Sequence, residues 1–210
     1  MAINKEGMMF ILSSPSGAGK TTLTKKLAKN NTNFAISISH TTRTPRPNEI
    51  NGEDYHFVSN EKFNILVKEN SFFEYANIFN NHYGTLKKPV LKLLSHGKDV
   101  LFDIDWQGTQ QLKKIENLSL VTIFILPPDK QVLRNRLLNR HDGQEKIINE
   151  RMKKFSEEMS HWNEYNYVVI NDDLEKCYDK ILKIIISEKK GKPQKQNLQE
   201  IKKKVEELIK

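Results

Sequence analysis

Ser14-Pro15-Ser16-Gly17-Ala18-Gly19-Lys20-Thr21 connects an apolar run at residues 8–12 to a helical pattern that has Leu23 and Leu27 on one face. The apolar run has the composition of a buried strand, so a glycine-rich turn stands between a strand and a helix. This is the context of a phosphate-binding P-loop, in which successive backbone N–H groups surround an anion at the helix N-terminus. A turn that only joins two elements is the alternative, and Gly-Lys-Thr at the start of the helix argues against it. The sequence therefore predicts that residues 14–21 bind a nucleoside triphosphate.

Side chains of this loop and of a second apolar run indicate a site for magnesium beside the phosphates. Lys20 is expected to bring a positive charge to the β- and γ-phosphates, and the hydroxyl of Thr21 is placed to ligate Mg²⁺. Asp103 and Asp105 end a second apolar run, where they share one face of a strand at the edge where α/β sheets bind ligands. We predict that Asp103 reaches Mg²⁺ through water; two solvated carboxylates at an exposed strand end are the alternative.

Composition limits the class of protein. The 210 residues fit one large domain, or a core with a small inserted one. No apolar stretch approaches the ~20 residues that cross a bilayer and no signal peptide is evident, so we expect no membrane partner. The single cysteine, Cys177, fits a reducing cytoplasm and is expected to pack rather than react. Much of the formal charge of +8 lies at 189–193 and 202–204. The chain is also rich in Lys, Asn and Ile, a pattern that a coding bias produces, so we do not expect nucleic-acid binding.

Apolar runs alternate with helical patterns along most of the chain, which predicts a doubly wound α/β core around a parallel sheet. Strands are expected at 34–38, 100–104, 120–126 and 167–170, and helices at 109–115, 129–139, 145–162 and 174–187. Residues 1–39 and 97–188 would form this three-layer P-loop core, with a short mobile lid at about 137–150. Residues 40–96 break the rhythm, with prolines and one short helix at about 60–69, and are predicted to form an inserted α+β lobe.

The last segment, 189–210, is expected to be a basic, flexible linker followed by a helix. Leu198, Ile201, Val205 and Leu208 form one apolar stripe on this helix, and a stripe needs a partner surface. The partner is either the chain's own core or a second copy of the chain in a homo-oligomer.

Arginines cluster in two places that suit phosphate chemistry. Arg43 and Arg46 lie three residues apart in a segment that prolines keep out of helix, and two guanidinium groups suit a phosphate. Arg136 and Arg140 share a helical face, and with Arg151 they flank a polar stretch that could carry them over transferring phosphates. A solvated basic loop and ordinary surface arginines are the alternatives.

These segments together resemble the guanylate kinases, from about residue 9 to residue 186. The matching motifs are Ser-Pro-Ser-Gly-Ala-Gly-Lys-Thr at 14–21, Ser-His-Thr-Thr-Arg-Thr-Pro-Arg-Pro at 39–47, Gly-Glu-Asp-Tyr at 52–55, Phe-Phe-Glu-Tyr at 72–75, Asn-His-Tyr-Gly-Thr at 81–85, Asp-Ile-Asp-Trp-Gln-Gly at 103–108 and Ile-Asn-Asp-Asp at 170–173. The chain departs from the family pattern at Ser14, which replaces a glycine, and at His82, which stands where a second tyrosine is common. In the lid, His141-Asp142-Gly143 replaces a glycine-led turn after Arg140.

The resemblance implies Mg²⁺-dependent transfer of the γ-phosphoryl group of ATP to GMP, and to dGMP, in purine nucleotide metabolism and GMP recycling in the cytoplasm. It implies that the GMP phosphate is held by Arg43, Arg46, Tyr55 and Tyr83, that the guanine is surrounded by Ser39, Glu74, Thr85 and Asp105, and that Lys20, Arg43, Arg136, Arg140 and Arg151 are catalytic. Guanine offers donors at N1 and N2, whereas adenine has an acceptor at N1, so a carboxylate such as Glu74 favours guanine.

Two alternatives to this reaction remain. A kinase of the same fold could act on another phosphorylated acceptor, such as a ribose bisphosphate, and Glu74 would then have no base to contact. A guanylate-kinase-like domain could also bind a phosphopeptide without catalysis. Such domains typically lose P-loop or lid residues, whereas Lys20, Thr21, Asp103 and the lid arginines are all present here.

Overall fold

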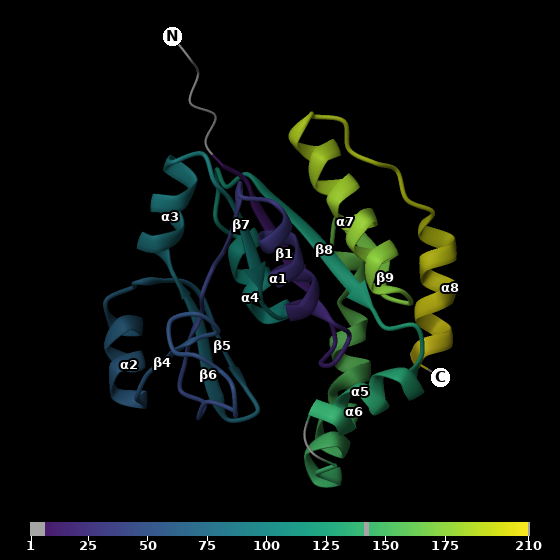
Figure 1. Cartoon of the computed structure of the whole chain (residues 1–210), viewed down its shortest axis with the longest axis horizontal. Coiled ribbons are helices and arrows are strands. Elements are labelled where there is room, and N and C mark those ends of the chain that lie inside the picture. Colours follow the sequence, from purple (N-terminus) through teal and green to yellow (C-terminus); the bar gives the residue numbers. More distant parts are fainter. Residues whose placement is uncertain (1–6, 141–142, 210) are drawn as a thin grey trace.

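Five parallel strands form the central sheet of the computed structural model, which describes residues 7–140 and 143–209 (Figure 1). The strands lie in the order β2 (Phe34–Ile36), β7 (Asp99–Asp103), β1 (Met9–Ser13), β8 (Leu120–Leu126) and β9 (Tyr167–Ile170). They are almost continuous apolar runs because helices cover both faces of the sheet. The predicted doubly wound α/β class is confirmed.

Helices on the two faces make a three-layer core. One face packs against α1 (Lys20–Asn30) and α7 (Leu174–Lys189), which bring Leu23, Leu27 and Ile181 into one cluster with β1 and β7. The other face packs against α3 (Lys87–Ser95) and α4 (Trp106–Lys113) near β7, and against α5 (Lys130–Arg140) and α6 (Glu145–Ser160) near β8 and β9. Cys177 is fully buried in the first cluster, as a packing residue would be, and burial raises the pKa of its thiol to about 12.

The segment between β2 and α3 forms a second sheet. Its four strands lie in the order β4 (His56–Phe57), β3 (His40–Thr41), β6 (Asn81–Leu86) and β5 (Phe72–Ile78). Helix α2 (Asn60–Lys68) packs on it through Phe63 and Leu66 against Phe72. Ser59 begins this helix, because its hydroxyl accepts from the N–H of Lys62 at 3.2 Å. In Figure 1 this lobe lies at the lower left, and its strand β5 contacts α4 of the core, where the side chain of Gln111 bonds to the backbone of Tyr75.

Helix α3 was not expected from the sequence, which predicted only one helix in this part of the chain. Its sequence contains Pro89, but proline is tolerated in the first turn of a helix, where its missing N–H costs nothing. Val90 and Leu94 are four residues apart and both are buried against the central sheet. The helix therefore lies within the range assigned to the inserted lobe, while its apolar face packs on the core.

The other predicted elements agree with the structure except at their ends. Strand β2 is shorter than predicted, although the N–H of Ser37 still bonds to the Leu101 carbonyl at 2.9 Å before the chain leaves the sheet. Helix α4 starts three residues earlier than predicted, because Asp105 caps it. The helix predicted at 145–162 ends at Ser160 and is followed by a 3₁₀ turn, η1 (Trp162–Glu164). In the described residues no helix is long and apolar enough to cross a membrane.

The C-terminal segment packs on the chain's own core. In α8 (Leu198–Ile209), Val205 and Leu208 are buried against Phe155 and Met159 of α6, whereas Leu198 is 63% exposed. The predicted linker is fixed at several points. The side-chain amide of Gln196 accepts from the N–H of Val168 at 2.8 Å and donates to its carbonyl at 2.9 Å. The hydroxyl of Tyr167 accepts from the N–H of Gln194 at 3.0 Å.

Removal of residues 189–210 is expected to lower thermal stability and to preserve the GMP phosphorylation that the resemblance implies. Loss of α8 removes Val205 and Leu208 and uncovers Phe155 and Met159, at a cost of about 2–4 kcal/mol, or roughly 5–15 °C in Tm for a chain of this size. Calorimetry and a coupled kinase assay measure the two effects. Leu198→Ala, in an exposed position of the same helix, is the control and should leave Tm unchanged. A folded truncated protein without activity would contradict this division of the chain.

Candidate active site

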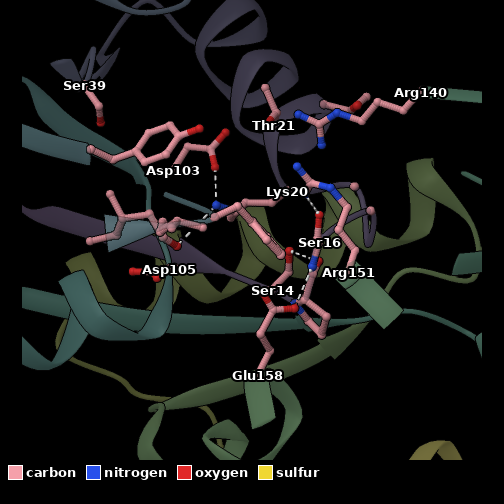
Figure 2. A pocket seen from close by; sticks show the side chains of 18 of the residues that line it. Ser14, Ser16, Lys20, Thr21, Ser39, Asp103, Asp105, Arg140, Arg151 and Glu158 are labelled. Carbon is pink, nitrogen blue, oxygen red and sulfur yellow. Dashed lines mark hydrogen bonds and ion pairs between the residues drawn. The ribbon is translucent and has the colours of Figure 1, made fainter. Parts of the chain in front are cut away.

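The residues that the sequence singled out gather around one cavity of about 670 Å³ at the C-terminal ends of β1 and β7, between the core and the lobe (Figure 2). Its lining includes Ser14, Pro15, Ser16, Gly17, Gly19, Lys20 and Thr21 of the P-loop, Ser39, Arg43, Arg46, Tyr55, Glu74 and Tyr83 from β2–β6, and Asp103, Asp105, Arg136, Arg140 and Arg151 of the core. Ala18 and Thr85 are the two predicted site residues outside this lining, and both are buried. The structure thus brings the predicted donor and acceptor residues to one place.

The P-loop backbone explains which glycines the motif needs. Gly17 and Gly19 have φ values of 92° and 101°, which favour glycine, whereas Ser14 is not among the residues with positive φ. A Cβ on Gly19 would also come within 2.3 Å of Nδ2 of Asn171. Serine at the first position of the motif is therefore compatible with the loop.

Lys20 and Asp103 form an ion pair at the floor of the cavity, with Nζ 2.5 Å from Oδ1 (Figure 2). Nζ also donates to the carbonyl of Ile104 at 3.3 Å. The described residues include no group of three or more acidic, histidine or cysteine side chains that would hold a metal unaided. Mg²⁺ is typically bound by one or two protein oxygens together with substrate phosphates. The hydroxyl of Thr21 and the carboxylate of Asp103, both in the cavity lining, supply the oxygen donors that such a site needs.

Arg43 and Arg46 are held together by an acidic residue that the sequence analysis missed. Glu49 accepts from Nη2 of Arg43 with both oxygens at 2.9 Å, and from Nη1 of Arg46 at 3.2 Å. The guanidinium of Arg43 also lies 5.4 Å from the ring centroid of Tyr55, whose ring in turn lies 5.9 Å from that of Tyr83. Burial is the main cause of a raised pKa of Tyr55, so its phenol stays protonated as a donor for an anion. An acidic residue just after two arginines was the available signal for Glu49.

Glu74 lies in an enclosed polar corner of the cavity. Its residue is 3% exposed, it is paired in register with Thr85, and Oε1 has no hydrogen-bond partner among the described residues. Burial, and then the negative charge of Asp105, raise the pKa of this carboxyl to about 7, although hydrogen bonding to Thr85 opposes them. The hydroxyls of Ser39 and Thr85 lie 3.2 Å apart beside it.

Asp105 has a structural task as well as a place in the lining. Its Oδ1 caps α4 by accepting from the N–H of Gly108 at 3.0 Å, and its Oδ2 accepts from Nε2 of Gln107 at 3.1 Å. A carboxylate has about four lone-pair directions, so these two bonds leave acceptor capacity toward the cavity.

The three predicted lid arginines differ in their surroundings. Nη1 and Nη2 of Arg136 donate to the carbonyls of Ala18 and Asn171 at 3.3 and 3.4 Å, which ties α5 to the P-loop. Arg140 lies exposed at the end of α5. Arg151, on α6, donates to the hydroxyl of Ser16 (Figure 2). Of the atypical lid residues, His141 and Asp142 lie outside the described residues.

Two more residues at the P-loop were absent from the predicted site. Glu158, two helical turns after Arg151, accepts from the N–H of Ser16 at 3.1 Å. Burial is the main cause that raises the pKa of its carboxyl to about 7. Nδ2 of Asn171 donates to the Ala18 carbonyl at 2.7 Å. The spacing of Glu158 from Arg151 was the signal for the first, and the Ile-Asn-Asp-Asp motif was the signal for the second.

Gly108→Ala is expected to weaken GMP binding selectively. A Cβ at this position would lie 2.5 Å from Oε2 of Glu74, so the carboxylate must move. Forcing an extra methyl group into a packed site typically costs about 1–3 kcal/mol, which predicts roughly a 5- to 150-fold rise in the KM for GMP. The KM for ATP, measured in the same variant, is the control and should change less than twofold. Equal changes in both constants would contradict the assignment of Glu74 to the acceptor.

The affinity for GMP is expected to rise with pH through neutrality. The folded protein holds the pKa of Glu74 at about 7, and in the role that the resemblance implies the carboxylate is the form that would accept from guanine. Below this pKa the protonated form dominates, so the affinity should fall by up to about tenfold per pH unit. Titration calorimetry between pH 6 and 8 measures this, with Glu74→Gln as the control for the titration of the GMP phosphate itself. A wild-type slope no steeper than that of the variant would contradict the prediction.

The cavity has a P-loop on one side, a paired-arginine site suited to an anion on the other, and further arginines between them. These features define a P-loop kinase that transfers a phosphoryl group to a phosphorylated acceptor.

Comparison with known proteins identifies the family. The guanylate kinase family model matches residues 6–188. The guanylate kinase of Rickettsia prowazekii is 50% identical over 189 residues, which cover 90% of this chain and 95% of that protein. That of Paramagnetospirillum magneticum is 46% identical over 187 residues, covering 89% and 87%. The crystal structure of guanylate kinase from Anaplasma phagocytophilum matches with a TM-score of 0.73 at 34% identity, over 88% of this chain and 87% of that one. The chain belongs to the guanylate kinase family, whose reaction is phosphoryl transfer between ATP and GMP.

Proposed function

We propose that this chain transfers the γ-phosphoryl group of ATP to GMP in the cavity described above, giving ADP and GDP. The observation that supports the choice of acceptor most directly is the buried carboxylate of Glu74, which has an unpartnered oxygen in the described structure and shares the cavity with Arg43 and Arg46. A carboxylate accepts from the N1–H and amino groups of guanine, whereas it would face a lone pair at N1 of adenine. Leaving buried polar groups unpaired is a strong way to reject an analogue.

The acceptor side would divide into a phosphate site and a base site. Arg43 and Arg46, fixed by Glu49, would bind the GMP phosphate together with the hydroxyls of Tyr55 and Tyr83. Ser39, Glu74, Thr85 and Asp105 would surround the guanine. Two guanidinium groups share one carboxylate, so the pair keeps a net positive charge, to which the nearby Arg140 adds, and a bound phosphate would neutralise this charge.

Transfer needs no nucleophile from the protein. An oxygen of the GMP phosphate attacks the γ-phosphorus, and the bond from that phosphorus to the β–γ bridging oxygen breaks, leaving its electrons on ADP. The chain's part is to hold the two nucleotides in line and to place positive charge where negative charge is shared. We assign that task to Lys20 and the P-loop N–H groups, with Arg140 and Arg151 at the transferred group. Arg136 would also hold the P-loop through its bonds to Ala18 and Asn171.

The family supports ATP as co-substrate, and we propose that Mg²⁺ accompanies it. Thr21 would ligate the ion directly and Asp103 through water, which requires Lys20 to leave Asp103 for the phosphates. When bound, the ion neutralises charge on the β- and γ-phosphate oxygens.

We also propose which parts of the chain form the acceptor site, the lid and the core. Residues 40–96 would carry the acceptor site and 137–150 would form the lid, on a core of residues 1–39 and 97–188. Phosphoryl transfer requires exclusion of water, so lobe and lid should approach each other when both nucleotides bind. We place the reaction in the cytoplasm, which the single, buried thiol of Cys177 favours.

A coupled assay of ATP turnover with GMP, AMP, UMP and CMP as acceptors tests the function. We expect GMP to be preferred by a factor of about 10² or more, because the discrimination rests on buried hydrogen bonds. Turnover with another phosphorylated acceptor, and none with GMP, would favour a different kinase of the same fold. Absence of turnover with every acceptor would favour a binding domain.

A further inference from the structure

The tip of the β5–β6 hairpin has an unfavourable residue at a turn. Ile78 pairs with Asn81, so Phe79 and Asn80 form a two-residue turn, with φ values of 49° and 62°. This left-handed backbone favours glycine and asparagine, and a bulky aromatic residue there is uncommon. Asn80 fits its position and Phe79 does not. Strain at a residue that lines a cavity points to a task for its side chain.

The ring of Phe79 contacts a helix of the core. The guanidinium carbon of Arg151 lies 4.6 Å from the ring centroid, and Nζ of Lys154 lies 4.6 Å from it. Both cations belong to α6, whereas Phe79 belongs to the lobe, and in Figure 1 the two elements lie at opposite sides of the lower part of the molecule. The turn therefore carries an aromatic face from the acceptor side of the cavity to the donor side.

Arg151 lacks the acidic partner that fixes Arg43 and Arg46. Among residues 7–140 and 143–209, no carboxylate lies within ion-pair distance of its guanidinium, and its Nε has no hydrogen-bond partner. Burial, followed by the nearby positive charges of Arg140 and Arg46, lowers its pKa to about 10. Its fixed contacts are the hydroxyl of Ser16 and the ring of Phe79.

An aromatic ring suits this position because it leaves the positive charge of Arg151 available to a phosphate. A ring attracts a cation through its quadrupole and carries no net charge. A carboxylate in the same place would hold Arg151 equally well and would cancel the charge that the arginine offers to a phosphate. Phe79 can thus orient the guanidinium over the P-loop while its full charge remains.

We propose that Phe79 is a positioning residue that holds Arg151 over Ser16, so that the approach of the acceptor lobe and the placement of a donor-side arginine are one event. The proposal rests on the proposed function, in which Arg151 acts on the transferred phosphoryl group. Lys154 lies on the same ring and is exposed, so it supports the contact from the solvent side.

Four single variants separate the ring from the turn. Phe79→Asn gives the turn a residue that fits its backbone and removes the ring, so it should keep or raise Tm and lower kcat about tenfold. Phe79→Leu keeps an apolar side chain without a π face and should lower kcat to the same extent. Phe79→Trp keeps the π face and should retain kcat within about threefold. Tyr75→Leu, an exposed aromatic position on the strand that leads into the turn, is the control and should leave kcat unchanged.

The measurements are kcat, the KM values for ATP and GMP, and Tm, each in the wild type and in an Arg151→Ala background. We expect kcat to fall with the KM for GMP within twofold, and Phe79→Leu to have no further effect once Arg151 is alanine. Any of three results would overturn the proposal. Phe79→Asn could lose Tm and kcat together, or Phe79→Leu could lower kcat as much in the Arg151→Ala background as in the wild type. The third is wild-type kcat in both Phe79→Asn and Phe79→Leu. Failure of the wild type itself to phosphorylate GMP would refute the proposed function instead, so the two failures are distinct.

Discussion

Replacing Lys20 by alanine is expected to lower kcat by about 10³-fold or more, which corresponds to at least about 4 kcal/mol of transition-state stabilisation. The ammonium group is predicted to reach the β- and γ-phosphates of ATP, and in this structure it pairs with Asp103. The variant loses that charge and also leaves an uncompensated carboxylate at the floor of the cavity, which repels phosphate. Both effects weaken the stabilisation of the negatively charged phosphates of ATP, so both lower kcat.

The fold should survive this change, because Lys20 and Asp103 lie at the cavity surface and not in a hydrophobic cluster. Coupled-assay kcat and the Tm of the same preparation measure the two quantities. Lys29→Ala, at an exposed position of the same helix, is the matched control and should keep normal turnover. Near-normal activity in Lys20→Ala would show that the P-loop assignment is wrong.

Glu74→Gln is expected to lower the affinity for GMP by roughly 1–3 kcal/mol, the scale of an unsatisfied buried polar group. The substitution preserves shape and replaces one acceptor with a donor, which would point at the donors of guanine. Because the side chain is almost completely buried, water cannot replace the lost bond. Affinity for ATP should hardly change, since the carboxylate lies on the acceptor side.

Titration calorimetry with GMP and with ATP measures the two affinities for this variant. Glu61→Gln, at an exposed position on α2, is the control for loss of one negative charge from the lobe. Unaltered affinity for GMP in Glu74→Gln would remove Glu74 from the base site. Glutamine would then be tolerated because the carboxylate served packing only.

The sequence predicted the core well where one local signal dominated. The buried strands are continuous apolar runs, and Gly17 and Gly19 take the left-handed backbone that a P-loop requires. It missed α3, in which Pro89 and two lysines at the start concealed a narrow apolar face. The position of α8 also needed tertiary information, because a stripe of apolar residues indicates that a partner exists and not which surface provides it.

For the site, the sequence predicted the residues and missed how they are arranged. Glu158 acts on Ser16, which is distant in the sequence and which only the fold brings near, whereas Glu49 lies close to its two arginines in the chain. Phe79 belongs to a turn whose backbone angles no composition rule predicts for phenylalanine. The roles of the residues in the cavity stay predictions until the variants are measured. Asp105 illustrates the limit, since a helix cap and a base contact require the same residue type.

The bond pair between Gln196 and Val168 has a consequence for how molecules of this protein meet one another. Strand β9 is an end of the central sheet, so the N–H and C=O groups on its outer side would be free to pair with a strand of another molecule. The side-chain amide of Gln196 bonds to both the N–H and the C=O of Val168, which are the two bonds that a residue of a neighbouring strand would make. A polar side chain from the C-terminal segment thereby blocks the pairing groups of Val168 on an edge that would otherwise favour intermolecular sheet extension. Concentrated solutions of the 210-residue chain should therefore resist aggregation better than those of a chain without residues 189–210.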